Sequence, residues 1–188
     1  ELLWLEALAS NNERMAKFKA LGVLWLLVPR HPQRFDEVYN LVEQAGWHCH
    51  RRSAWGDLVP TSPLHAEIDV LLGDSLGEMH AYYLISQLAL LGGSFAPFGG
   101  QNLIEAAACA CPVIMGPHTF NFSDAADCAE TYGAALRVKD MHAALDLVLL
   151  ALSHPQWRVQ ALLGSQKLLD MGRGAVQHHT QILKANWL

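Results

Sequence analysis

The sequence predicts an α/β fold in which a doubly wound parallel sheet is covered by helices on both faces. The first observation is that short apolar segments alternate along the whole chain with longer amphipathic ones. This alternation is typical of buried parallel strands joined by helical crossovers. The second is the composition of the 188 residues, of which 52% are apolar and 16% charged. Such a chain can bury a sizeable core, so we expect one domain over residues 1–188.

The expected strands are short apolar runs, most of which end at glycine, proline or a polar residue. They cover residues 22–28, 47–51, 68–72, 88–91, 112–115 and 135–138. The expected helices have apolar residues at helical spacing. They cover residues 1–20, 33–45, 78–87, 102–110, 122–131 and 140–152, with one more beginning at Pro155 and a last one after Gly174. Segment 52–67 contains Gly56, Pro60 and Pro63 and is expected to be a loop.

Two glycine pairs mark the most informative segment of the chain. An apolar run ends at Gly92, Gly93 and Ser94, and a second pair that ends at Gly100 leads into the Ala-rich segment 102–110. A strand, an exposed turn and a helix N-terminus in this order bring free N–H groups and the positive end of a helix dipole to one point. Glycine lets a ligand approach the backbone closely. The segment therefore predicts a phosphate-binding loop.

Glu105 extends this prediction from a phosphate to a nucleotide. If Asn102 caps the helix, Glu105 lies in the first turn, where its carboxylate can accept hydrogen bonds from both hydroxyls of a ribose. A capping box, in which Asn102 and Glu105 each accept the other's backbone N–H, explains the same two residues without a ligand. Both interpretations stay open at this point.

A loop after the first expected strand offers a cation to the same edge of the sheet, where ligands bind in parallel sheets. Pro29 and Arg30 directly follow the strand, so Arg30 can reach a phosphate, although Arg34 competes for any anionic role. The alternative is a solvated arginine before a helix that begins at Pro32.

Two more loops follow expected strands. Leu76, Gly77 and Glu78 precede a helix, so N–H groups there can meet a base or a phosphate; the alternative is an ordinary helix start with an acidic first turn. In segment 116–122, His118 and Asn121 are candidates for ligand contact. The alternative is a capping loop in which Asn121 or Ser123 begins the next helix.

Charge and residue counts exclude several classes of function. The net charge of −5 argues against a nucleic-acid surface, and no apolar run approaches the length of a membrane span or forms a signal peptide. The four cysteines form no C-x-x-C pair, so we expect a reduced environment with Cys109 and Cys111 buried. The ten histidines form no set at metal-ligand spacing, so no metal site is predicted. Neither a G-x-S-x-G elbow nor a Walker lysine is present.

Three segments together carry a resemblance to a known family. They are LLVPRHPQRF (26–35), DVLLGDSLGEM (69–79) and LGGSFAPFGGQNLIEAAACACPVIMGPHTFNF (91–122), and they occur in the same order. In these segments the chain resembles the carboxy-terminal domain of 3-deoxy-D-manno-octulosonic acid (Kdo) transferases. That family attaches Kdo to lipid A in the lipopolysaccharide of Gram-negative bacteria. Two departures stand out: Gln101, where histidine is expected, and Phe98, where a smaller or basic residue is common.

The resemblance implies a fold and a division of labour. The chain would be the carboxy-terminal half of a GT-B glycosyltransferase, in which two Rossmann-like domains face each other and this half holds the donor, CMP-Kdo. The amino-terminal half, absent here, would bind the lipid A precursor, carry the membrane anchor and supply the general base. The chain begins at Glu1 without a methionine, so we expect a piece of a longer protein. That protein would act at the cytoplasmic face of the inner membrane, while the fragment is expected to be soluble and inactive alone.

The resemblance and the loops together define the expected site. No catalytic residue, metal or cofactor is expected in this chain, and its partner is CMP-Kdo. Substrate-binding residues would be Pro29, Arg30, Leu76, Gly77, Glu78, Gly92, Gly93, Ser94, Asn102, Leu103, Ile104 and Glu105, with Gly100, His118 and Asn121 as further candidates. Two alternatives remain: another GT-B enzyme, such as a UDP-sugar transferase or epimerase, and a nucleotide-binding module without enzymatic activity.

Overall fold

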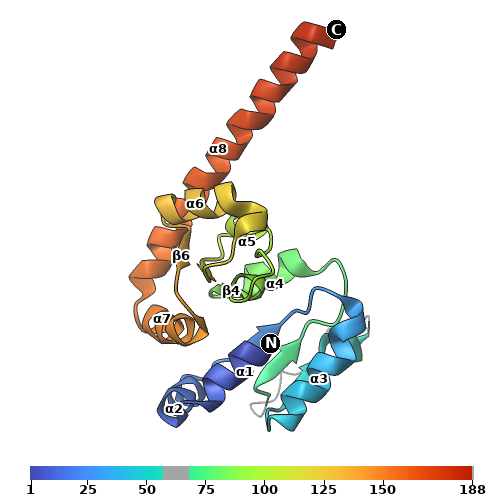
Figure 1. Ribbon diagram of the computed structural model, residues 1–188, viewed down its shortest axis with the longest axis vertical. Helices are drawn as coiled ribbons and strands as arrows, with labels where there is room; N and C mark the ends of the chain where they lie inside the picture. The colour runs from blue at the N-terminus through green and yellow to red at the C-terminus, as the bar shows by residue number, and fades with distance from the viewer. Residues whose placement is uncertain (57–67, 188) are drawn as a thin grey trace. The chain divides into compact units, whose positions relative to one another are not determined.

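The structure is a computed structural model that describes residues 1–56 and 68–187 (Figure 1). The chain divides into two compact units, Glu1–Tyr82 and Tyr83–Leu188, and each is described by itself. Most of the loop expected over 52–67 lies outside the described residues; its first part, Arg52–Trp55, forms the 3-10 helix η2.

The first unit is built on a three-stranded parallel sheet in the order β1-β3-β2. The strands are β1 (Trp25–Leu27), β2 (Cys49–Arg51) and β3 (Val70–Leu72), and the central β3 is fully buried. The helices are α1 (Leu2–Ala9), α2 (Asn12–Ala20), η1 (Pro32–Arg34) and α3 (Phe35–Gln44), and α4 (Met79–Ile85) begins in this unit. In Figure 1, α1 and α2 (dark blue) lie on one side of these strands and α3 (cyan) on the other.

The second unit contains a three-stranded parallel sheet in the order β4-β5-β6. The strands are β4 (Ala89–Leu91), β5 (Val113–Met115) and β6 (Ala135–Arg137), and β5 lies buried in the middle. Its helices are η3 (Gly92–Ser94), α5 (Ile104–Ala108), η4 (Phe120–Phe122), α6 (Ser123–Tyr132), α7 (Met141–Ser153) and α8 (Pro155–Trp187). Side chains of α5, α6 and α8 close the core against the sheet.

The predicted α/β class, with parallel sheets flanked by helices, is confirmed; the described strands pair as two sheets of three. Two helix predictions were wrong. Segment 1–20 is two helices, because the Asn11 side chain accepts a hydrogen bond from the Arg14 N–H and caps a new helix. The segment after Pro155 is one continuous helix, which passes through Gly172 and Gly174 without a break.

Cys109 and Cys111 are buried, as predicted, and all four cysteines are free thiols. Burial raises the pKa of the Cys111 thiol to about 12, so it stays protonated at neutral pH. Within the described part of the chain, no helix is both long enough and apolar enough to span a membrane. In the same residues, histidine, cysteine and acidic side chains form no cluster of three that could hold a metal ion.

Candidate functional site

Ser94 joins the loops that leave β4 and β5. Its hydroxyl donates to the Leu91 carbonyl (2.5 Å) and accepts from the Gly116 N–H (2.7 Å), while its carbonyl accepts from the His118 N–H (2.9 Å). Ser94 is completely buried. The Ser94 hydroxyl therefore holds two loops together from inside, and its predicted contact with substrate stays a prediction. A Cβ at Gly116 would lie 2.4 Å from the Ser94 carbonyl oxygen, which explains why glycine is needed there.

The second glycine pair turns the chain back onto the first. Gly99 and Gly100 have φ angles of +83° and +76°, a conformation that favours glycine. The Gly100 N–H donates to the Gly93 carbonyl (3.2 Å), and the Gly93 N–H donates to Oε1 of Gln101 (3.1 Å). The Gly93 N–H that was expected to face a phosphate is thus already bonded in this structure.

Asn121 fixes the tip of the same loop. Its backbone N–H donates to the Gly99 carbonyl (3.1 Å), and its Nδ2 donates to the Phe98 carbonyl (2.9 Å). No side chain caps α6, so the alternative in which Asn121 or Ser123 caps this helix is wrong. Asn121 instead holds the glycine loop in place. Phe98 and Phe120 are 73% and 61% exposed beside it.

Asn102 and Glu105 are paired, but not as a capping box. Asn102 Oδ1 accepts from the Ile104 N–H (3.0 Å), and its Nδ2 donates to Glu105 Oε1 (3.3 Å). A capping box would instead use the backbone N–H groups of both residues. The helix α5 begins at Ile104 rather than at Asn102, and Glu105 is exposed. Leu103, predicted to bind substrate, is 1% exposed and belongs to the core.

In the first unit, Arg30 and Arg34 differ in their partners. Arg34 forms ion pairs with Glu1 and Glu37, both at 3.0 Å. Arg30 is exposed, follows the buried Pro29, and has no ion pair with the residues that the structure describes. Of the two candidates, Arg30 is therefore the cation available to an anionic ligand.

The loop between β3 and α4 is held by its acidic residues. Glu78 accepts from Arg52 Nη2 (2.8 Å), from the Tyr82 hydroxyl (2.7 Å) and from the Ser75 hydroxyl. Asp74 pairs with Arg51, whose Nε lies 3.0 Å from Oδ2. These contacts leave Leu76, which is 73% exposed, and Gly77, with φ of +81°, at the tip of the loop.

Glu78 gives this loop a measurable pH dependence. Hydrogen bonds from Ser75 and Tyr82, with the charge of Arg52, lower the pKa of Glu78. The stability that these contacts add is present above the unfolded pKa of about 4.3 and is lost as pH falls through the lower folded pKa. We expect Glu78→Gln to lower the melting temperature at pH 7, with a difference from wild type that shrinks towards pH 3.

Thermal unfolding of both proteins from pH 7 to pH 3 tests this. The control is Glu6→Gln, on an exposed position of α1, which should change the melting temperature little at any pH. A Glu78→Gln difference that stays constant over the whole pH range would contradict the assignment.

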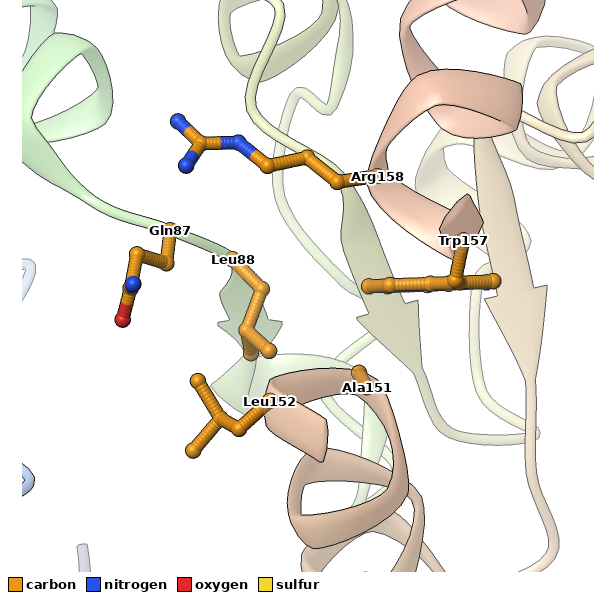
Figure 2. A pocket seen from close by; sticks show the side chains of 6 residues that line it. All are labelled: Gln87, Leu88, Ala151, Leu152, Trp157 and Arg158. Carbon is orange, nitrogen blue, oxygen red and sulfur yellow. The ribbon is translucent and has the colours of Figure 1, made fainter. Parts of the chain in front are cut away.

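A shallow pocket of about 110 Å³ lies elsewhere in the second unit. It is lined by Gln87, Leu88, Ala151, Leu152, Trp157 and Arg158. Figure 2 shows that the Gln87 side chain points away from the Arg158 guanidinium, so the polar groups do not converge. Leu88 directly precedes β4, which places the pocket at the amino edge of the sheet. None of the predicted site residues lines it, and ligands of parallel sheets bind at the opposite edge.

Comparison with known proteins decides the family. A 3-deoxy-D-manno-octulosonic acid transferase from Bordetella pertussis is 48% identical over 166 residues, which cover 88% of this chain and 37% of the relative. The crystal structure of the C-terminal CMP-Kdo binding domain of WaaA from Acinetobacter baumannii matches with a TM-score of 0.73 and 34% identity, over 88% of this chain and 80% of that one. The chain belongs to the Kdo transferase family. No protein-family model matches it.

The match covers most of this chain but less than half of the length of each of two Kdo transferases. The enzyme of Haemophilus influenzae is 37% identical over 193 residues, which cover 97% of this chain and 43% of the relative. The chain thus spans about two-fifths of the length of these curated Kdo transferases.

Sequence reasoning missed the roles of three residues that shape the candidate site. Tyr82 lies four residues after Glu78, one helical turn away, and this spacing could have indicated their contact. Arg52 lies 26 residues before Glu78, and no local pattern connects them. Gln101 was treated only as a departure from the family, although it directly follows the second glycine pair and precedes helix α5.

Proposed function

We propose that this chain is the donor-binding domain of a glycosyltransferase that transfers Kdo from CMP-Kdo to a lipid A precursor in lipopolysaccharide biosynthesis. The observation that carries the proposal is the match to a structure described as a CMP-Kdo binding domain. In this chain, hydrogen bonds of the loops after β4 and β5 hold two glycine turns in place. The acceptor site and the general base would belong to a further domain at the cytoplasmic face of the inner membrane. Residues 1–188 alone would then transfer no Kdo.

The proposed reaction is a displacement at the anomeric carbon of Kdo. An acceptor hydroxyl oxygen forms the new bond to that carbon, its proton passes to a base outside this chain, and CMP leaves with the electron pair of the broken bond. Negative charge therefore grows on the phosphate of the leaving group. Arg30 is proposed to stabilise that charge, and Glu105 to hold the ribose hydroxyls and orient the leaving group.

Isothermal calorimetry with CMP, UMP and UDP tests the proposed donor. The chain is expected to bind CMP more tightly than UMP or UDP, because the donor carries cytosine and a single phosphate. Preference for UDP would replace the proposal with another GT-B enzyme. Absence of binding to all three nucleotides would remove the nucleotide site altogether.

Arg30→Ala is expected to weaken CMP binding by about 1.5–3 kcal/mol, the range for a hydrogen bond to a charged group. The fold should be unaffected, because Arg30 is exposed and its removal opens no cavity. Arg34→Ala is the matched control: this guanidinium is bound to Glu1 and Glu37, so its loss should leave CMP affinity unchanged. Equal CMP affinities of the wild type and Arg30→Ala would show that Arg30 is a solvated surface residue without a role in binding.

Glu105→Gln separates a ribose contact from a structural one. Glutamine can still accept a hydrogen bond from Asn102 Nδ2, so the melting temperature should barely change. CMP binding should weaken, because a glutamine amide cannot accept from both ribose hydroxyls through two oxygens. With 2′,3′-dideoxy-CMP as ligand, the wild type should lose about 1–3 kcal/mol and the variant less. If the wild type binds CMP and its dideoxy analogue equally, Glu105 has no ribose role.

A further inference from the structure

The backbone of Gly93 is bonded on both sides by the second glycine turn. Its N–H donates to Oε1 of Gln101 (3.1 Å), and its carbonyl accepts from the Gly100 N–H (3.2 Å). In this structure the Gly93 N–H is therefore not free to donate to an anion. The Gln101 side chain occupies the position where an anion would accept from this N–H.

The bond from Gly93 determines how the Gln101 amide is oriented. Because an N–H is a donor, only the carbonyl oxygen of the amide can face it, and the two N–H groups of the amide are those of Nε2. A Cβ at Gly93 would lie 2.6 Å from Nε2 and 3.1 Å from Cδ, so the Gln101 amide lies close beside Gly93. A side chain at position 93 would therefore displace the Gln101 amide from this position.

Nε2 of Gln101 is left as an oriented donor. Gln101 is half-buried, and none of the hydrogen bonds among the described residues uses its Nε2. The nearby Glu105 carboxylate accepts from Asn102 through Oε1. The bond from the Gly93 N–H to Oε1 also polarises the amide, which strengthens its N–H groups as donors.

We propose that Gln101 binds the phosphate of the nucleotide donor through Nε2 and relays the hydrogen bond that the Gly93 N–H no longer makes. The ligand class is a phosphate monoester or diester carried by a nucleoside. This inference rests on the proposed function, because it assigns a contact within the same nucleotide site.

Gln101→Glu tests the contact with almost no change in shape. Glutamate keeps an oxygen that accepts from Gly93 but replaces the Nε2 donors with a charged oxygen, which repels a phosphate. By calorimetry on the full 188-residue chain, CMP affinity should fall at least about tenfold, whereas cytidine affinity should change less than about twofold. Gln160→Glu, at an exposed position of α8, carries the same charge change and should alter neither affinity.

Gln101→His adds a readout that a purely structural role would not move. An imidazole N–H keeps a donor at this position, so part of the CMP affinity lost in Gln101→Glu should be retained. Imidazole gains a positive charge as pH falls through about 6.5. The ratio of CMP affinities of Gln101→His to wild type at the same pH should therefore rise from pH 8 to pH 6, and this ratio cancels titration of the CMP phosphate itself.

The outcomes separate this inference from the proposed function. Equal losses for CMP and cytidine in Gln101→Glu, or no loss for either, overturn the phosphate contact while the donor site stands. A flat affinity ratio for Gln101→His between pH 8 and pH 6 overturns it as well, even if Gln101→Glu does not fold. Failure of the wild type to bind CMP overturns the proposed function and this inference together.

Discussion

Gly164→Ala is expected to destabilise the protein by about 3 kcal/mol, at the upper end of the range for overpacking. Gly164 lies in the long helix α8, where it meets the C-terminal turn of α6. A Cβ on it would lie 2.4 Å from the Tyr132 carbonyl oxygen and 2.6 Å from the Ala134 nitrogen. Both atoms are backbone, so no side-chain rotation can relieve the clash. The two helices would have to move apart, which opens the core that they cover.

Gly172→Ala in the same helix is the matched control. A Cβ there meets nothing within 4 Å, and alanine is favoured over glycine in a helix by about 1 kcal/mol. This variant should therefore be slightly more stable than wild type. Urea unfolding followed by circular dichroism compares the three proteins. If Gly164→Ala unfolds at the same urea concentration as Gly172→Ala, the result contradicts a close approach of α8 to the end of α6 at Gly164.

These two glycines show what a single sequence reveals about helices. Apolar spacing predicted most strands and helices of both units, because each buries one face or both. A glycine in the sequence, however, can either end a helix or lie inside a continuous one, and the sequence pattern does not distinguish the two. Gly174 was interpreted as a break between two helices, yet one helix continues through Gly172 and Gly174 at a modest cost in propensity. Conversely, the cap at Asn11 was visible in the sequence as an asparagine followed by an acidic residue, but was not used.

The candidate site shows the same limit at a finer scale. The loops at Gly92 and Gly99 were predicted because glycine pairs interrupt the apolar pattern, and the loop at Gly116 because it follows an expected strand. Which atoms those glycines make room for was not predictable, since their partners come from distant positions. Ser94 and Gly116 are 22 residues apart, and only the fold brings the hydroxyl to the N–H. Gly93, which was interpreted as space for a ligand, lies beside Gln101, and Gly116 makes room for the Ser94 backbone.

Ser94→Ala is expected to destabilise the protein by about 1–3 kcal/mol, the cost of leaving a buried polar group without a partner. Removal of the hydroxyl deprives the Gly116 N–H of its acceptor and the Leu91 carbonyl of a donor. The space left behind is smaller than a methyl group, so a cavity adds little. Because this hydroxyl joins the loops after β4 and β5, Ser94→Ala should also weaken CMP binding, although the Ser94 side chain is itself buried.

Ser165→Ala is the matched control, because both serines are buried to within 1% exposure but differ in what their hydroxyls do. Among the residues that the structure describes, the Ser165 hydroxyl donates to the Ala161 carbonyl one turn earlier in α8, a local bond that adds little to a helix. Its loss should change the free energy of unfolding by less than about 1 kcal/mol, since alanine has the higher helix propensity. Chemical denaturation measures both variants. Similar free energies of unfolding for the two would mean that the Ser94 hydroxyl does not join the loops, and the glycine turns would then have to be held by Gln101 and Asn121 alone.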